Sequence, residues 1–190
     1  MKISRESYYS AALILLASIV LFACPMLSAV ESTDENPQVT QLLADARDKA
    51  AVLSRDADEM ESLTRSDVSW QTHASMLETM KDDVNNMAKI VEKLQTSRNS
   101  ASPWQRQAID RMVPVLKELA SNTTAAINHL NQEHNRPTSG EYAEYLRQNS
   151  ETARELSDMI SSFVKYDETR AKLDKLEQKL EIGNGKRASR

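Results

Sequence analysis

Residues 96–105, TSRNSASPWQ, decide the fold because they form a polar corner between two long helical patterns. Ser102, Pro103 and Gln105 have the order of a helix start: an N-cap residue, a proline in the first turn, and the third-position partner of a capping box. The polar tract before them ends the preceding pattern. The sequence therefore predicts that one helix ends near residue 97 and that another begins at residue 103.

Before this corner, apolar residues recur at steps of three and four, which is the spacing of an amphipathic helix. Asn36 and Pro37 read as an N-cap followed by a first-turn proline, so we expect a helix over about residues 37–66. The polar stretch TRSDVS separates it from a second helix over about residues 69–97.

After the corner, the helix that begins at residue 103 keeps its apolar spacing across Pro114, where we expect a kink and not an end. The stretch NRPTSGE makes the next corner, and Thr138 with Glu141, or Ser139, is expected to cap the last helix. That helix should run to about residue 182, where GNG stops it.

These patterns predict an all-α fold, an up-down-up-down four-helix bundle with an elongated last helix, because short corners make sequential helices antiparallel. The first three helices span about 45 Å each at 1.5 Å per residue and the last about 63 Å, so it should overhang. A long helical hairpin and a helical dimer stay open as alternatives. The chain has only 3 glycines and 5 prolines, which suits long helices.

The N-terminus has the layout of a secretory signal peptide: Lys2 and Arg5, an apolar run over residues 8–23, and the small pair Ser28 and Ala29. The expected organisation is a signal peptide over 1–29, a flexible N-terminal segment over 30–36, the helical bundle domain over 37–182 and a disordered basic tail over 183–190. Cleavage leaves no stable membrane span, and we expect a periplasmic or secreted protein.

Two alternatives to cleavage after residue 29 remain open. Cys24 stands where a lipid-carrying cysteine of a lipoprotein could stand, and the apolar run approaches the length of an uncleaved membrane anchor. Pro25 and the small residues after it favour cleavage.

Charge and cysteine usage exclude several functions. Without residues 1–29, 22 Lys and Arg face 27 Asp and Glu, a net charge of −5, so no nucleic-acid partner is expected. Cys24 is the only cysteine, so the cleaved chain would have no disulfide, thiolate metal site or cysteine nucleophile.

The stretch SWQTHASMLETM, residues 69–80, raises the question of a haem or metal site. The expected topology brings His73 to the same end of the bundle as His134, Met60 and Met76, which are the candidate ligands, whereas His129 should lie on the opposite side of its helix. A histidine and a methionine can hold haem iron in a bundle. The layout resembles the b-type cytochrome bundles in helix count and export signal, with no shared motif.

We nevertheless expect no cofactor and no metal at this end of the bundle. One imidazole cannot define a coordination sphere, and a buried histidine is satisfied by a single threonine, tyrosine or backbone carbonyl partner. The Cys-x-x-Cys-His attachment of c-type haems and the repeated Glu-x-x-His of di-iron bundles are both missing from the sequence.

No catalytic motif stands out, so we expect no enzyme. The leading hypothesis is an exported, non-enzymatic helical bundle that acts by contact with an unknown protein or an envelope surface. A haem- or metal-binding periplasmic four-helix bundle is the second, and a periplasmic helical chaperone or stress sensor the third. Residues 167–182 have a thin leucine seam with mixed charges, which predicts either a solvated helix end or a contact with a second copy or another partner.

Overall fold

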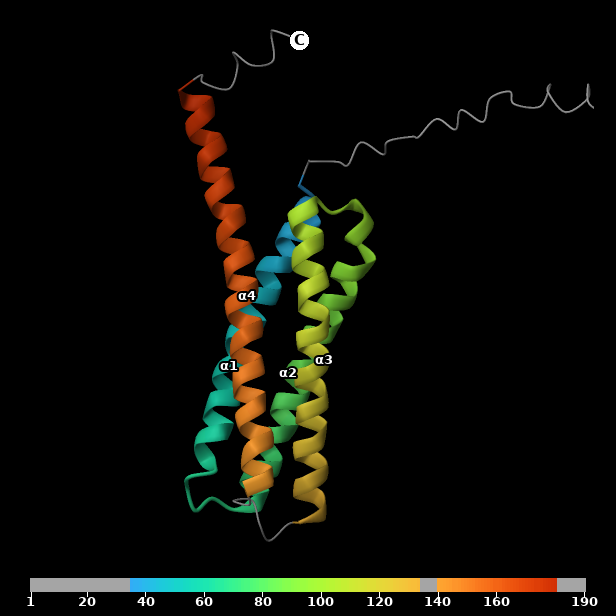
Figure 1. Cartoon of the computed structure of the whole chain (residues 1–190), viewed down its shortest axis with the longest axis vertical. Helices are drawn as coiled ribbons and strands as arrows, with labels where there is room; N and C mark the ends of the chain where they lie inside the picture. Colours follow the sequence, from blue (N-terminus) through green and yellow to red (C-terminus); the bar gives the residue numbers. More distant parts are fainter. Residues whose placement is uncertain (1–34, 134–139, 181–190) are drawn as a thin grey trace, which may run out of the picture. The chain divides into compact units, whose positions relative to one another are not determined.

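The computed structural model describes residues 35–133 and 140–180, and these form four α-helices. They are α1 (Pro37–Leu63), α2 (Trp70–Thr96), α3 (Pro103–Gln132) and α4 (Gly140–Lys179), with a 3₁₀ turn, η1, at Arg98–Ser100. Each helix packs against its neighbours in sequence, and α4 also packs against α1, which closes the bundle (Figure 1). The predicted up-down-up-down four-helix bundle with a long last helix is confirmed.

The starts of α1 and α3 follow the predicted capping residues Asn36 and Ser102, and Ser69 is a further N-cap that the sequence pattern did not single out. The Asn36 side chain accepts hydrogen bonds from the amides of Gln38 (2.9 Å) and Val39 (3.3 Å). The Ser69 hydroxyl accepts from the amide of Thr72. At the corner before α3, the side chain of Gln105 accepts from the amide of Ser102 at 2.9 Å, which is the return bond of the predicted capping box.

The helix ends differ from the predicted ends by a few residues. Helix α1 ends at Leu63 and not at 66, because the amides of Thr64, Arg65 and Ser66 bond to carbonyls three residues back and tighten the chain into turns. Helix α3 continues through the exposed Pro114, as predicted, and ends at Gln132. Helix α4 ends at Lys179, about three residues before its predicted end. The predicted caps Thr138 and Ser139 and the residue ranges 1–29 and 183–190 lie outside the described residues.

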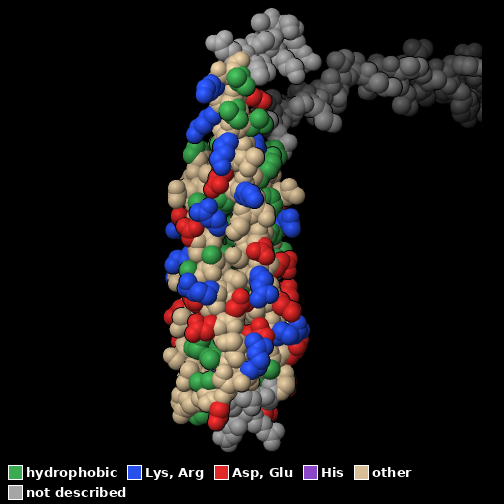
Figure 2. All heavy atoms as spheres, turned by 90° about the vertical axis from the view of Figure 1, so that its left-hand side faces the viewer, with side chains coloured by type: hydrophobic (Ala, Val, Ile, Leu, Met, Phe, Trp, Pro, Cys, Tyr) green, Lys and Arg blue, Asp and Glu red, His purple; other side chains and the backbone are tan. Residues whose placement is uncertain are grey.

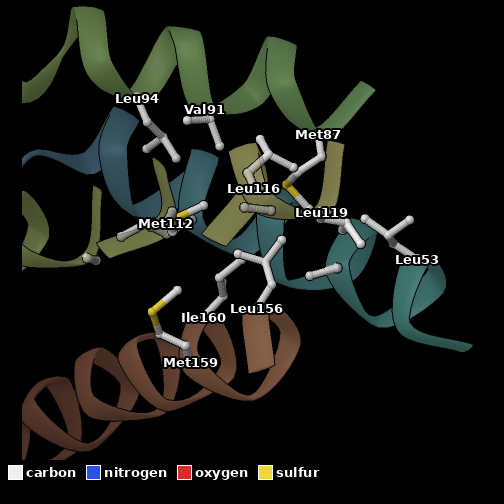
Figure 3. Packing of buried hydrophobic residues seen from close by; sticks show 14 of the residues in the cluster. Leu53, Met87, Val91, Leu94, Met112, Leu116, Leu119, Leu156, Met159 and Ile160 are labelled. Carbon is white, nitrogen blue, oxygen red and sulfur yellow. The ribbon is translucent and has the colours of Figure 1, made fainter. Parts of the chain in front are cut away.

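The core is a column of apolar side chains contributed by all four helices (Figure 3). Helix α1 offers mostly small and medium residues such as Ala46, Ala50 and Leu53 to this column, and α2 and α3 offer methionines such as Met87 and Met112. Methionine is flexible and fills irregular gaps between helices. The predicted stripes therefore face inward, and no helix in the described ranges is long and apolar enough to cross a membrane.

Helix α4 extends past the ends of the other helices. All of residues 171–180 are exposed, and they project beyond the ends of the neighbouring helices in Figure 1. We call this segment the arm. The overhang that the sequence predicted from helix lengths is therefore present.

Candidate functional site

The first candidate site is the end of the bundle that holds the α1–α2 corner, as the sequence predicted. A separate apolar cluster fills it, drawn from all four helices; its buried members are Met60, Leu77, Ala126, Leu130, Tyr142 and Leu146. We call this end the histidine pole because His73 and His129 both lie there, against Tyr142.

His73 is fully buried in the first turns of α2. Its Nδ1 lies 3.2 Å from the hydroxyl of Tyr142, and the two rings meet edge to face at 5.5 Å. Burial lowers the pKa of His73 below its usual 6.5, so the neutral imidazole is favoured. The tyrosine partner is of the kind that the sequence predicted, but Nε2 is buried with no hydrogen-bond partner among the described residues.

The other candidate ligands do not assemble into a described coordination sphere. Met60 is fully buried and Met76 half-buried, and both belong to the same apolar cluster as Tyr142. His134 lies outside the described residues. Within the described part of the chain, no three His, Cys, Asp or Glu side chains are grouped so that they could hold a metal ion.

The sequence pattern misplaced His129. It was expected on the far side of α3, yet it is half-buried, stacks on Tyr142 with ring centroids 5.9 Å apart, and meets Tyr145 edge to face at 6.1 Å. A histidine ring is long enough to contact the core from the edge of the apolar stripe. The spacing of apolar residues alone does not predict such a contact. His73, Tyr142, His129 and Tyr145 thus form one continuous aromatic group.

The second candidate site lies at the opposite end, where α4 leaves the bundle. A groove of about 430 Å³ runs between α3 and α4, and its lining includes Trp104, Arg111, Phe163 and Tyr166. Tyr166 is 49% exposed. The guanidinium of Arg111 lies 5.7 Å from the Phe163 ring centre, within the range of a cation–π contact. The groove is therefore an aromatic surface edged by positive charge.

The groove continues directly into the arm. Leu173 is 54% exposed, Leu176 55% and Leu180 62%, and together with Tyr166 they are the large hydrophobic residues exposed in the described chain. Figure 2 shows hydrophobic side chains at the upper end of this face with Lys and Arg beside them. We call residues 162–179 of α4 and the following Leu180, together with the adjoining groove, the arm surface.

A group of polar contacts fixes the base of the arm. The Glu35 carboxylate accepts a hydrogen bond from Trp104 Nε1 at 3.1 Å and pairs with Arg170 at 2.8 Å. The Trp104 and Tyr166 rings meet edge to face at 5.7 Å, and the Arg170 guanidinium lies 5.7 Å from the Tyr166 ring centre. The chain entering α1 is thereby bound to both α3 and α4 at the point where the arm departs.

Asp167 belongs to the same group. Its carboxyl is partly buried and close to the Glu35 carboxylate, and burial together with this like charge raises its pKa to about 6. The Asp167 carboxyl therefore keeps its proton to a higher pH than an ordinary aspartate does.

Sequence reasoning missed this second site. From the sequence, Trp104 was interpreted only as an aromatic residue that covers a helix end. Glu35 lay in a segment expected to be flexible. Their contacts join residues 69 positions apart, which no local pattern encodes. The one available signal was the leucine seam of residues 167–182, which did point to the arm.

The described part of the chain is thus a four-helix bundle with a filled histidine pole at one end and a projecting apolar arm at the other. Comparison with protein-family models, with curated proteins and with solved structures gave no match.

Proposed function

We propose that the protein is an exported, non-enzymatic helical bundle that acts by contact with another protein through the arm surface. The observation that carries this proposal is the exposure of Leu173, Leu176 and Leu180 on a helix that projects beyond its own bundle. A contiguous exposed apolar surface with a polar rim is typical of a protein contact site.

The contact function is tested by placing a photo-crosslinking amino acid at Leu176 in the cell that makes the protein. Gln178, on the opposite side of the same exposed arm, is the matched control position. We expect a discrete protein adduct from position 176 and none from 178. Equal labelling at both positions would contradict a specific contact surface.

Export is tested by the mass of the purified protein. The order of basic, apolar and small residues before Ala29 predicts a chain that begins at residue 30. A mass that retains Met1 would contradict cleavage, and a mass that begins at a lipid-modified Cys24 would make the protein a lipoprotein.

A second candidate function is haem or metal binding at the histidine pole, and the buried, unpartnered Nε2 of His73 is the observation that favours it. Haem titration of the purified protein tests it. We expect no Soret band because Tyr142 and the surrounding apolar cluster pack against this histidine. A Soret band that disappears in His73→Leu would make haem binding the function.

A further inference from the structure

The arm continues a helix that is already formed, so its helical shape needs no separate nucleation. Its own side chains, however, bury little surface against the bundle. All ten side chains are exposed, so within one copy of the chain no tertiary packing stabilises them. A second surface that covers the leucines would supply that packing.

The seam of the arm has the spacing of a two-stranded coiled coil. Tyr166, Leu173 and Leu180 are seven residues apart, and Thr169 and Leu176 occupy the intervening fourth positions, so these residues fall on the a and d positions of a heptad. The d position before Thr169 is Ser162, which lines the groove. The seam thus covers residues 162–180, about 28 Å at 1.5 Å per residue.

The flanking charges favour the same seam on a second copy. Lys172 is at a g position and Glu177 at the following e position, so two parallel copies in register place Lys172 of each beside Glu177 of the other. Lys165 and Arg170 form the one like-charged pair of this arrangement. Arg170 is already paired with Glu35 of its own chain at 2.8 Å, which weakens that repulsion.

The antiparallel arrangement fits less well. Pairing Leu173 with Leu176 of an antiparallel copy brings Lys172 beside Lys179 but also Arg170 beside Glu177, so the flanking charges balance. The core of that arrangement is poorer, because it sets Leu180 against the polar Thr169. The parallel register instead stacks each leucine on its own counterpart, and it brings the two aromatic grooves together.

We propose that two copies of the chain pair in parallel and in register through residues 162–180. This inference rests on the proposed contact function and names its partner as a second copy. The two-fold axis runs along the seam, so each copy presents the same face. The arms alone bring three leucines each, and Phe163 and Tyr166 at the groove extend the contact onto the bundles.

The first test is the mass of the particle in solution, measured by light scattering on protein purified as the cell processes it. We expect a dimer for the natural chain and a monomer for Leu173→Glu/Leu176→Glu. The matched control is Ala171→Glu/Gln178→Glu, which adds the same charge on the outer face of the arm and should stay dimeric. A natural chain that is still monomeric at about 100 micromolar, where weak dimers form, would overturn the proposal.

A charge exchange tests the register. Lys172→Glu or Glu177→Lys alone places like charges across the seam and should weaken the dimer about tenfold. Combining both changes restores the opposite pairing only in the parallel register, so it should recover the dimer. If the combined variant stays as weak as the single variants, the parallel register is wrong.

A cysteine at position 173 gives an independent readout. In a Cys24→Ser background, Leu173→Cys should oxidise to a covalent dimer because a positions face each other in a parallel pair, whereas Gln178→Cys should not. Equal oxidation of both variants would contradict the seam. The photo-crosslink at Leu176 separates the two proposals. If the chain is monomeric and the crosslink joins it to a different protein, the homodimer is wrong and the proposed contact function is supported.

Discussion

The buried side chain of Gln105 connects the starts of two helices through hydrogen bonds. Its Oε1 accepts from the amides of Asn36 (3.0 Å) and Ser102 (2.9 Å), and its Nε2 donates to the Asn36 carbonyl and the Thr40 hydroxyl, both at 3.0 Å. The primary amide has two donor hydrogens and two acceptor lone pairs on its oxygen, so its hydrogen-bonding capacity is filled. It ties the start of α1 to the start of α3.

Gln105→Ala should therefore lower the free energy of unfolding by about 2–3 kcal/mol, because the buried amide of Ser102 and the part-buried backbone groups of Asn36 lose a partner. Chemical denaturation measures the change. Gln107→Ala, at an exposed position in the same helical turn, is the control and should change stability by less than about 0.5 kcal/mol. Equal effects would show that the network contributes nothing.

The His73 and Tyr142 pair should be energetically coupled. His73→Leu removes the contact to the Tyr142 hydroxyl, and Tyr142→Phe removes the hydroxyl itself, so a double-mutant cycle should give a coupling of about 1 kcal/mol. We expect His73→Leu alone to fold with a change of about 1–2 kcal/mol. Because burial lowers the pKa of His73, the natural chain should also lose stability as the pH falls below about 6.5, and His73→Leu should lose less. A cycle without coupling would mean that the contact does not form.

Asp167 should have the opposite pH dependence. Its folded-state pKa of about 6 lies above the usual 3.8, so the folded chain holds the proton more tightly, and this contribution is lost as the pH rises through 6. Asp167→Asn should therefore gain stability relative to the natural chain between pH 4 and pH 7. Thermal unfolding across that range measures the difference, with Asp174→Asn on the exposed arm as the control. A difference that does not vary with pH would rule out the shared burial of Asp167 and Glu35.

At the scale of the helices, the sequence predicted most of what the structure shows. Helix starts depend on local capping chemistry, so the caps Asn36 and Ser102 could be predicted from the sequence. Helix ends depend on competing turns, which is why α1 ends three residues before its predicted end. The contacts of Gln105, Trp104 and Glu35 cross between helices and could not be predicted, since they require the bundle to be assembled first.

The arm should be dispensable for the fold. Ending the chain after Arg170 keeps the Glu35 contact, and every described residue that it removes is exposed, so the melting temperature of the bundle at low concentration should hardly change. The same truncation should convert the dimer to a monomer, because it deletes all three exposed leucines. Calorimetry and light scattering measure the two outcomes. A large loss of thermal stability in an already monomeric sample would mean that the arm supports its own bundle.

At the scale of the whole molecule, the two ends of the bundle differ in character. The histidine pole is closed by aromatic rings and apolar side chains from four helices, whereas the arm end leaves leucines exposed and holds a titrating carboxyl at the base of the projection. Contact with a partner is therefore expected at the arm end.

The methionine-rich core has a consequence for how this protein meets oxidants. Of its 8 methionines, Met60, Met80, Met87 and Met112 are at most 1% exposed in the described helices. Met76 is half-buried at the histidine pole, and Met159 is 8% exposed and lines the groove. A thioether converts to a polar sulfoxide only where peroxide can reach it, and the oxygen then no longer fits an apolar core. Among the described methionines, dilute peroxide should first modify Met76 and Met159, and mass spectrometry should find the other four altered only when the helices separate. Sulfoxide at Met87 or Met112 would then record past openings of the bundle.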